Sequence, residues 1–254
     1  MSSFAKFIGA SLGWSLGGPI GGILGFALGS LIDGFTGLED NFSKQRHGQK
    51  ATKSGDFEIS LLILAAVVIK ADGKIDRREL DFVRRNFISM YGKEKANRAF
   101  KLFNGILKED ISTRQVCIQI RQHMSHASRL QLLHFLFGIA KADGAVSHVE
   151  IQIIKTISVY LYINNRDFES IRAMFSSASR GRSSGGYTSS TAYKILEITK
   201  KATNAEVKKA YRRLVKKHHP DKLRHLGEEY QKGAEDKFRQ IQKAYEQIQK
   251  DRGM

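Results

Sequence analysis

Cysteine, proline and tryptophan are scarce in this 254-residue chain, which has one cysteine, two prolines and one tryptophan. A single cysteine cannot form an internal disulfide, so disulfide-stapled folds are excluded and a reducing, intracellular setting is expected. Helix-breaking prolines are almost absent, and so is the strict alternation of apolar and polar residues that is typical of strands. We therefore predict an all-α fold.

Acidic side chains are also in deficit. The chain has 42 lysines and arginines against 25 aspartates and glutamates, a net charge of +17. Residues 191–254 alone carry 17 basic and 9 acidic side chains, close to half of this surplus. A basic surface is compatible with nucleic acid, anionic lipid or an acidic protein partner, and charge alone does not choose among them.

No charged residue occurs in residues 7–32, a stretch long enough for a helix to cross a bilayer. Every fourth position in it is glycine: Gly9, Gly13, Gly17, Gly21, Gly25 and Gly29. On a helix these positions form a groove that lets two backbones approach closely in lipid. We expect residues 1–35 to be a glycine-zipper membrane segment that contacts lipid and supports a homodimer. A helical hairpin or a soluble glycine-rich tail broken at Pro19 stays open.

Basic residues cluster after this stretch, at Lys44, Arg46, Lys50 and Lys53. Because the basic flank of a membrane helix stays in the cytoplasm, we expect a single-pass inner-membrane anchor with the bulk of the chain in the cytoplasm. Residues 36–56 are expected to be a polar linker.

Residues 57–175 predict a compact helical domain. Apolar periodicity indicates helices over 57–70, 76–91, 93–108, 112–123, 126–142, 147–162 and 164–175. The segment 70–80 resembles the segment 141–151, offset by 71 residues, and each copy follows a very apolar stretch. We infer that one αα-hairpin is used twice.

The two repeated turns contain acidic residues, which raises the possibility of a metal site. Asp72, Asp76 and Glu79 could supply oxygens, but their spacing is not that of an EF-hand loop. The second copy has Ser147 in place of Asp76, which keeps a helix cap and removes a ligand. We therefore predict no metal site. The expected roles are helix ends at Gly73 and Gly144, caps at Asp76 and Ser147, and capping boxes completed by Glu79 and Glu150.

Two isolated side chains of the predicted domain could suggest chemistry. Cys117 lies in an apolar helical pattern, and His134 lies in the run 132–137 without a partner histidine or cysteine at ligand spacing. We expect Cys117 to pack in the core and His134 to be a hydrogen-bonded core or groove residue. The sequence predicts no catalytic residue and no cofactor.

A linker and a basic helix follow. Residues 176–190 contain seven serines and three glycines, which predicts a flexible connection. Thr203 and Glu206 form a capping-box pattern at the start of an amphipathic helix. Its apolar stripe is Val207, Ala210, Tyr211 and Leu214, and its basic face is Lys208, Lys209, Arg212, Arg213, Lys216 and Lys217. Pro220 cannot continue the helix, so His219-Pro220-Asp221 should be displayed in a loop.

These residues carry a family resemblance. Residues 191–249 resemble a J-domain in three features: the Lys-Lys-Ala-Tyr-Arg-Arg-Leu core of its second helix, the His-Pro-Asp loop, and flanking helices at the required spacing. We assign residues 191–254 to it as a helical hairpin. Residues 57–175 resemble the TerB-like (tellurite-resistance) helical domain. The order of anchor, TerB-like bundle and J-domain resembles the membrane-anchored DjlA-type DnaJ-like co-chaperones.

The resemblance implies a partner, Hsp70 (DnaK) in its ATP state. It implies that Asp221 pairs with an arginine of Hsp70, that His219 adds hydrogen bonds and that Pro220 fixes the loop geometry. The remaining contacts would come from the basic helix through Tyr211, Arg212, Arg213, Lys216 and Lys217. ATP chemistry then belongs to Hsp70, so the chain itself is expected not to be an enzyme.

Two other functions stay open. The middle domain could be a metal or envelope-stress sensor with the J-domain as its output. The basic helix could instead bind nucleic acid through phosphates. Specific nucleic-acid recognition is not expected, because no exposed aromatic or amide side chains are interleaved with the charges.

Overall fold

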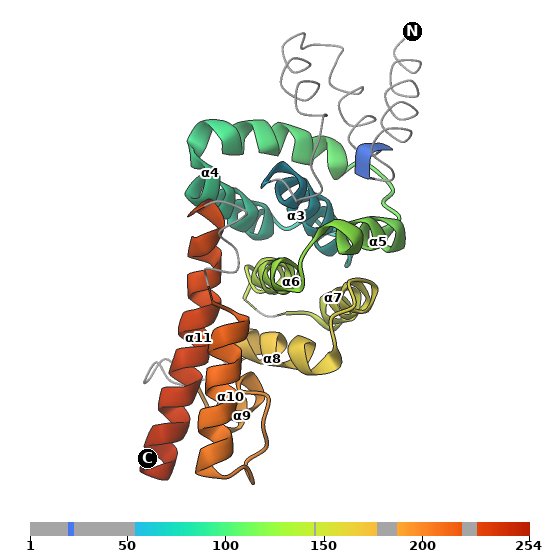
Figure 1. The fold of residues 1–254 in the computed structure, drawn as a ribbon. Helices are drawn as coiled ribbons and strands as arrows, with labels where there is room; N and C mark the ends of the chain where they lie inside the picture. Colours follow the sequence, from blue (N-terminus) through green and yellow to red (C-terminus); the bar gives the residue numbers. More distant parts are fainter. Residues whose placement is uncertain (1–19, 23–53, 145, 177–186, 220–227) are drawn as a thin grey trace, which may run out of the picture.

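The computed structural model of the protein describes residues 20–22, 54–144, 146–176, 187–219 and 228–254. In these residues every regular element is a helix, which confirms the all-α prediction (Figure 1). The helices are α3 (Ser54–Ile69), α4 (Arg77–Ile106), α5 (Thr113–His123), α6 (His126–Ala140), α7 (His148–Tyr160), α8 (Asn165–Ser176), α9 (Ser189–Ile195), α10 (Asn204–Lys217) and α11 (Glu228–Arg252).

Two helices, α3 and α6, form the centre of the bundle. They pack against each other, and α4, α7 and α8 pack around α6. From Leu130 to Ala140 every residue of α6 is buried, and α3 is buried on nearly all sides from Leu61 to Ile69. A helix that is apolar all round is stable in water only when neighbours cover every face. The two apolar runs of the repeat therefore become the middle of the domain.

The repeated turns have the expected backbone and differ in their caps. Gly73 and Gly144 have positive φ values of 79° and 121°, which glycine adopts without steric cost. Ser147 and Glu150 form a complete capping box. In the first copy Asp76 does cap the helix.

The capping box expected at Glu79 is only half formed, however: the Glu79 carboxyl accepts from the amide of Asp76, as expected, but the reciprocal bond is missing. The Asp76 carboxylate accepts from the amide of Arg78 at 2.7 Å and not from that of Glu79. Glu79 also lies buried beside Glu150, because the two repeats face each other. Burial and the nearby Glu150 charge raise the pKa of Glu79 to about 8. Within the described part of the chain no group of three or more His, Cys, Asp or Glu side chains is arranged to hold a metal ion.

The two helices predicted over residues 76–91 and 93–108 are joined in one kinked element, α4. Gly92 has non-helical backbone angles (φ 77°, ψ 165°) and bends the element sharply there (Figure 1).

Cys117 is fully buried, as predicted for core packing, and burial raises the pKa of its thiol to about 12. A thiol with so high a pKa is a poor nucleophile.

The C-terminal helices form a hairpin that packs on the bundle. Helices α10 and α11 lie antiparallel, α9 closes one end, and α11 extends along α4 and α6 (Figure 1). Their buried contacts are made by Tyr193, Leu196, Val207, Leu214, Ile241, Ala244 and Ile248. Helix α8 joins both parts, since Ala173 and Met174 belong to this second core. In addition, Ser170 donates a hydrogen bond to the carbonyl of Ile195 at 2.6 Å.

Several predictions fall on residues that the structure does not describe. Pro220, Asp221, most of the Ser/Gly linker and five of the six regularly spaced glycines (Gly9, Gly13, Gly17, Gly25 and Gly29) lie outside the described residues. Residues 20–22 are helical, and the amide of Ile20 donates to Oε1 of Gln119 at 2.9 Å. Across the described residues, no helix combines the length and apolar character needed to span a membrane.

Candidate functional site

The capping box places the start of the basic helix α10. The amide of Thr203 donates to the Glu206 carboxylate at 2.7 Å, and the amide of Glu206 donates back to the Thr203 hydroxyl at 3.3 Å. Val207, Ala210 and Leu214 are buried, and Val207 and Leu214 belong to the core shared with α9 and α11. The opposite face therefore turns outward, and it exposes Lys208, Lys209, Arg212, Arg213 and Lys216.

Tyr211 lies at the border of these two faces. Its ring stacks on that of Tyr245 of α11, with centroids 4.1 Å apart and planes 9° apart. Both rings are half-buried. The stack joins α10 to α11 beside the basic face, so Tyr211 contributes to the hairpin's packing and presents one ring edge to solvent.

The two histidines that end α10 have opposite environments. His218 is buried, and burial together with Lys237 holds its pKa well below the ordinary value. His219 is exposed, and its ring contacts the edge of Phe238 on α11 at a centroid distance of 6.2 Å. The first residue of the His-Pro-Asp sequence is thus displayed at the end of the basic helix.

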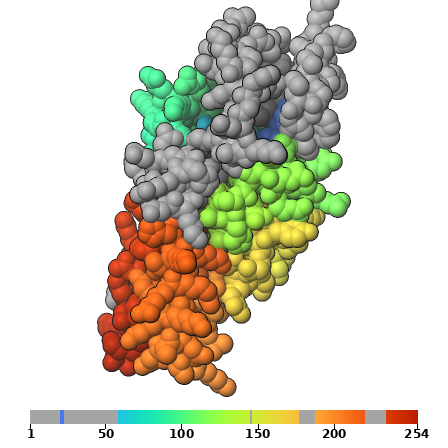
Figure 2. Space-filling view, in the orientation of Figure 1, coloured from blue at the N-terminus to red at the C-terminus, as the bar shows by residue number. Residues whose placement is uncertain are grey.

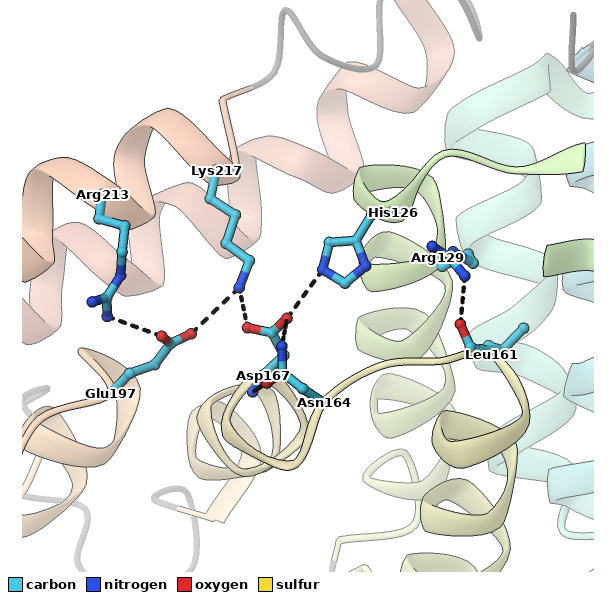
Figure 3. Close-up of polar contacts among 8 residues, drawn as sticks. All are labelled: His126, Arg129, Leu161, Asn164, Asp167, Glu197, Arg213 and Lys217. Atoms are coloured by element: carbon cyan, nitrogen blue, oxygen red, sulfur yellow. Dashed lines mark hydrogen bonds and ion pairs between the residues drawn. The ribbon is translucent and has the colours of Figure 1, made fainter. Parts of the chain in front are cut away.

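An ion pair ties this helix to the bundle (Figure 3). The Lys217 ammonium donates to the carboxylate of Asp167, which is the third residue of α8 and has a side chain only 1% exposed. Asp167 also accepts from His126 at 3.1 Å and from the Asn164 side-chain amide at 3.0 Å. Burial alone would raise the pKa of Asp167, but the hydrogen bonds from His126 and Lys217 outweigh it and lower that pKa well below its ordinary value.

A second carboxylate binds the same face of α10. Glu197 follows α9 with a positive φ of 59°, and its side chain is 3% exposed. It accepts from Arg213 at 2.9 Å and lies 3.7 Å from the Lys217 ammonium (Figure 3). Burial raises the pKa of Glu197, the opposite direction to that of Asp167.

The basic face therefore divides into two sets. Arg213 and Lys217 bind carboxylates within the molecule, whereas Arg212 and Lys216 point into solvent. Sequence reasoning did not find Asp167, Glu197 or His126. The only signal was Asn164 three residues before Asp167, which indicates the start of a helix and does not reveal a partner 50 residues away.

Comparison with protein families gives three matches in chain order. Residues 1–50 match the family model described as the co-chaperone DjlA transmembrane domain, residues 58–173 match tellurite resistance protein TerB, and residues 191–252 match the DnaJ domain. The chain is also 30% identical to the co-chaperone protein DjlA of Coxiella burnetii, with all of both chains covered. The chain belongs to the DjlA family of co-chaperones.

Other members of this family are similarly distant. DjlA of Shewanella oneidensis is 30% identical with full coverage of both chains. DjlA of Haemophilus influenzae is 28% identical, and the match covers all of this chain and 99% of the relative. No solved structure matches the chain. The family resemblance inferred from the His-Pro-Asp segment and the repeated turns is thus confirmed, and the C-terminal hairpin is a J-domain.

Proposed function

We propose that this chain binds Hsp70 in its ATP state and stimulates ATP hydrolysis through residues 219–221. The observation that supports this most directly is the position of His219. It is exposed at the end of the basic helix and contacts Phe238 of the opposite helix. Since the loop begins at this residue, its His-Pro-Asp sequence is anchored at one end by packing between α10 and α11.

The exposed half of the basic face would make the first contact with an acidic surface of Hsp70. Arg212 and Lys216 have exposed side chains and can steer the encounter over a Debye length of about 8 Å at physiological salt. Arg213 and Lys217 would have to exchange their internal carboxylates for those of the partner. The pairs with Glu197 and Asp167 therefore compete with docking, and the J-domain is expected to bind Hsp70 more weakly within this chain than on its own.

The test is the steady-state ATPase rate of a cognate Hsp70 with increasing amounts of the full chain. We expect a several-fold rise that is removed by His219→Gln and by Asp221→Asn. His123→Gln is the matched control, because it alters an exposed histidine at the end of α5, remote from α10 in sequence. No rise with the native chain, or an equal rise with all three variants, would reject the proposal.

Membrane anchoring by residues 7–32 is a second part of the proposal, with the J-domain in the cytoplasm. Its support is the match of residues 1–50 to a transmembrane-domain family and the absence of charge in the stretch. Alkaline extraction of membranes, with protease added to one side, tests it. Retention in the pellet with the C-terminal half cleaved only from the cytoplasmic side is expected.

The hydrogen bond between Ile20 and Gln119 leads to a competing prediction, in which residues 20–22 pack on the helical bundle and not in the membrane. If residues 20–22 stay on the bundle, a disulfide should form between Ile20→Cys and Gln119→Cys, and the chain should be released by alkali.

The proposed homodimer would be weakened by Gly17→Leu together with Gly21→Leu, measured as self-association in a bilayer. Unchanged self-association would contradict the glycine interface.

A further inference from the structure

A cavity lies where the TerB-like bundle meets the J-domain. Its volume is about 340 Å³, and its walls come from α3, α4, α6, the end of α8 and the J-domain helix α11. The apolar part of the wall is formed by Leu61, Phe82, Met90, Phe135 and Phe175. A cavity of this size, lined mainly by apolar and aromatic side chains, is typical of sites for small organic molecules.

Buried polar groups that lack good hydrogen bonds gather in this cavity. Oε1 of Gln131 has no hydrogen-bond partner among the described residues, and this side chain lines the cavity together with those of His134 and Gln240. The side chains of His134 and Gln240 interact with each other, but without a well-aligned hydrogen bond at Nε2 or Oε1. Gln131 and His134 are only 7% and 8% exposed. An unsatisfied buried polar atom costs about 1–3 kcal/mol, so one unpaired atom and two poorly paired ones at one place indicate that something absent from the folded chain binds there.

Gln131 and His134 come from the bundle, whereas Gln240 comes from the J-domain. His134 was expected to be a hydrogen-bonded core or groove histidine. It does line a groove, with its ring 4.8 Å from that of Phe175, and it interacts with the Gln240 side chain, although Nε2 has no well-aligned hydrogen bond. These polar groups therefore come from both domains and meet at the boundary between them.

The chemistry of the wall restricts the ligand. The two glutamine oxygens are acceptors, so they require hydroxyl or N–H donors. Burial, and the positive charge of Lys237, lower the pKa of His134 to about 3, so its ring is neutral at cellular pH and offers no charge to an anion. Asp236 and Lys141 carry opposite charges on the wall. Phenylalanine rings on several sides favour a flat apolar body.

We propose that this cavity binds a small neutral molecule with a flat apolar body and hydroxyl or N–H donors, and that the ligand bridges the TerB-like bundle and the J-domain. The amide oxygens of Gln131 and Gln240 accept from the ligand's donors, and the aromatic wall covers its body. The site is formed by residues other than His219 and the exposed arginine and lysine of α10, so it does not depend on the proposed action on Hsp70.

The test uses a matched pair of probes with the full chain in lipid nanodiscs. 2-Naphthol has a hydroxyl where 2-methylnaphthalene has a methyl group, and both are flat and close in size. We expect the native chain to bind 2-naphthol at least fivefold more tightly by titration calorimetry, since one hydrogen bond contributes about 1 kcal/mol. Partition into the lipid is the same for every variant and is subtracted with empty nanodiscs.

Variants then assign the binding to the cavity. Gln131→Met and Gln240→Met keep the side-chain length and remove one acceptor, so each should lower the affinity for 2-naphthol about fivefold and leave that for 2-methylnaphthalene unchanged or higher. Gln242→Met, an exposed position two residues from Gln240, is the control and should change neither. Gln240 is only half-buried, so its variant decides the matter if the buried Gln131→Met fails to fold.

Equal affinity of the native chain for both probes, or loss of 2-naphthol binding in the control alone, would overturn the assignment. Either result would mean that solvent fills the cavity.

Discussion

Lys217 of the J-domain and Asp167 of the TerB-like bundle form an ion pair across the boundary between the two domains (Figure 3). The carboxylate is buried, and the lysine lies two residues before the His-Pro-Asp sequence. In the space-filling view α10 and its neighbours form one continuous surface with α8 and the bundle (Figure 2). The second helix of the J-domain is therefore held in one orientation by a residue of the neighbouring domain.

Replacing the buried partner should cost more than replacing the lysine. Asp167→Asn leaves His126, Asn164 and Lys217 without their shared charge, so we expect a loss of about 2–4 kcal/mol in the free energy of unfolding. Lys217→Met should cost less, because Asp167 keeps two other donors. Lys216→Met, an exposed neighbour, should change stability by less than about 0.5 kcal/mol. Urea unfolding measures all three, and equal losses in the first two would contradict the ranking.

The division of the basic face predicts which charges set the rate of Hsp70 association. Arg212→Ala and Lys216→Ala should each lower the association rate several-fold at low salt and reduce its dependence on salt. Lys250→Ala, on an exposed site near the end of α11, is the control and should have little effect. Stopped-flow binding across salt concentrations gives these rates. A control that slows association as much as Arg212→Ala would show that only net charge matters.

Lys237 gives a pH dependence of stability. Burial lowers its pKa to about 7 from an ordinary value of 10.5, and His134 and His218 lie nearby. Between pH 7 and 10.5 the unfolded chain holds more protons than the folded chain, so this lysine makes stability rise as the pH is raised through that range.

Lys237→Met should remove that rise and stabilise the protein at pH 7, by an amount on the order of 3 kcal/mol. Unfolding midpoints at several pH values, compared between the native chain and the variant, measure the difference. Parallel curves for the two proteins would show that Lys237 is not held neutral by the fold.

The Tyr211–Tyr245 stack should stabilise the J-domain hairpin. Tyr245→Ala removes a half-buried ring and its stacking, so we expect a loss of about 2–3 kcal/mol. Tyr245→Phe keeps the ring and should cost less than about 1 kcal/mol. Thermal unfolding followed by circular dichroism tests the pair; a similar loss in both variants would assign the effect to the hydroxyl and not to the stack.

Local patterns in the sequence predicted most of the fold. The apolar runs of α3 and α6, the glycines at 73 and 144, the break between the helices 76–91 and 93–108, and the capping boxes at Ser147 and Thr203 each act within a few residues, so their consequences can be read along the chain. The surroundings of Glu79, where only half of the expected box forms, could not be predicted in this way. Its neighbour Glu150 is 71 residues away, and only the packing of one repeat on the other brings the two carboxyl groups together.

The candidate site was predictable only in part for the same reason. The amphipathic pattern of α10 predicted a basic face but not that Arg213 and Lys217 bind carboxylates from other elements. Asp167 and Glu197 appear in the sequence as ordinary acidic residues near helix ends. The cavity likewise depends on how α11 lies across α4 and α6, which no periodicity encodes.

The most direct test of the account is the rate at which Hsp70 hydrolyses a single bound ATP when mixed with the full chain in a lipid bilayer. The account predicts that the native chain accelerates this turnover several-fold, that Asp221→Asn abolishes the acceleration, and that Asp251→Asn, an exposed site at the end of α11, preserves it. Turnover that is the same with and without the native chain, or acceleration that survives Asp221→Asn, would contradict it.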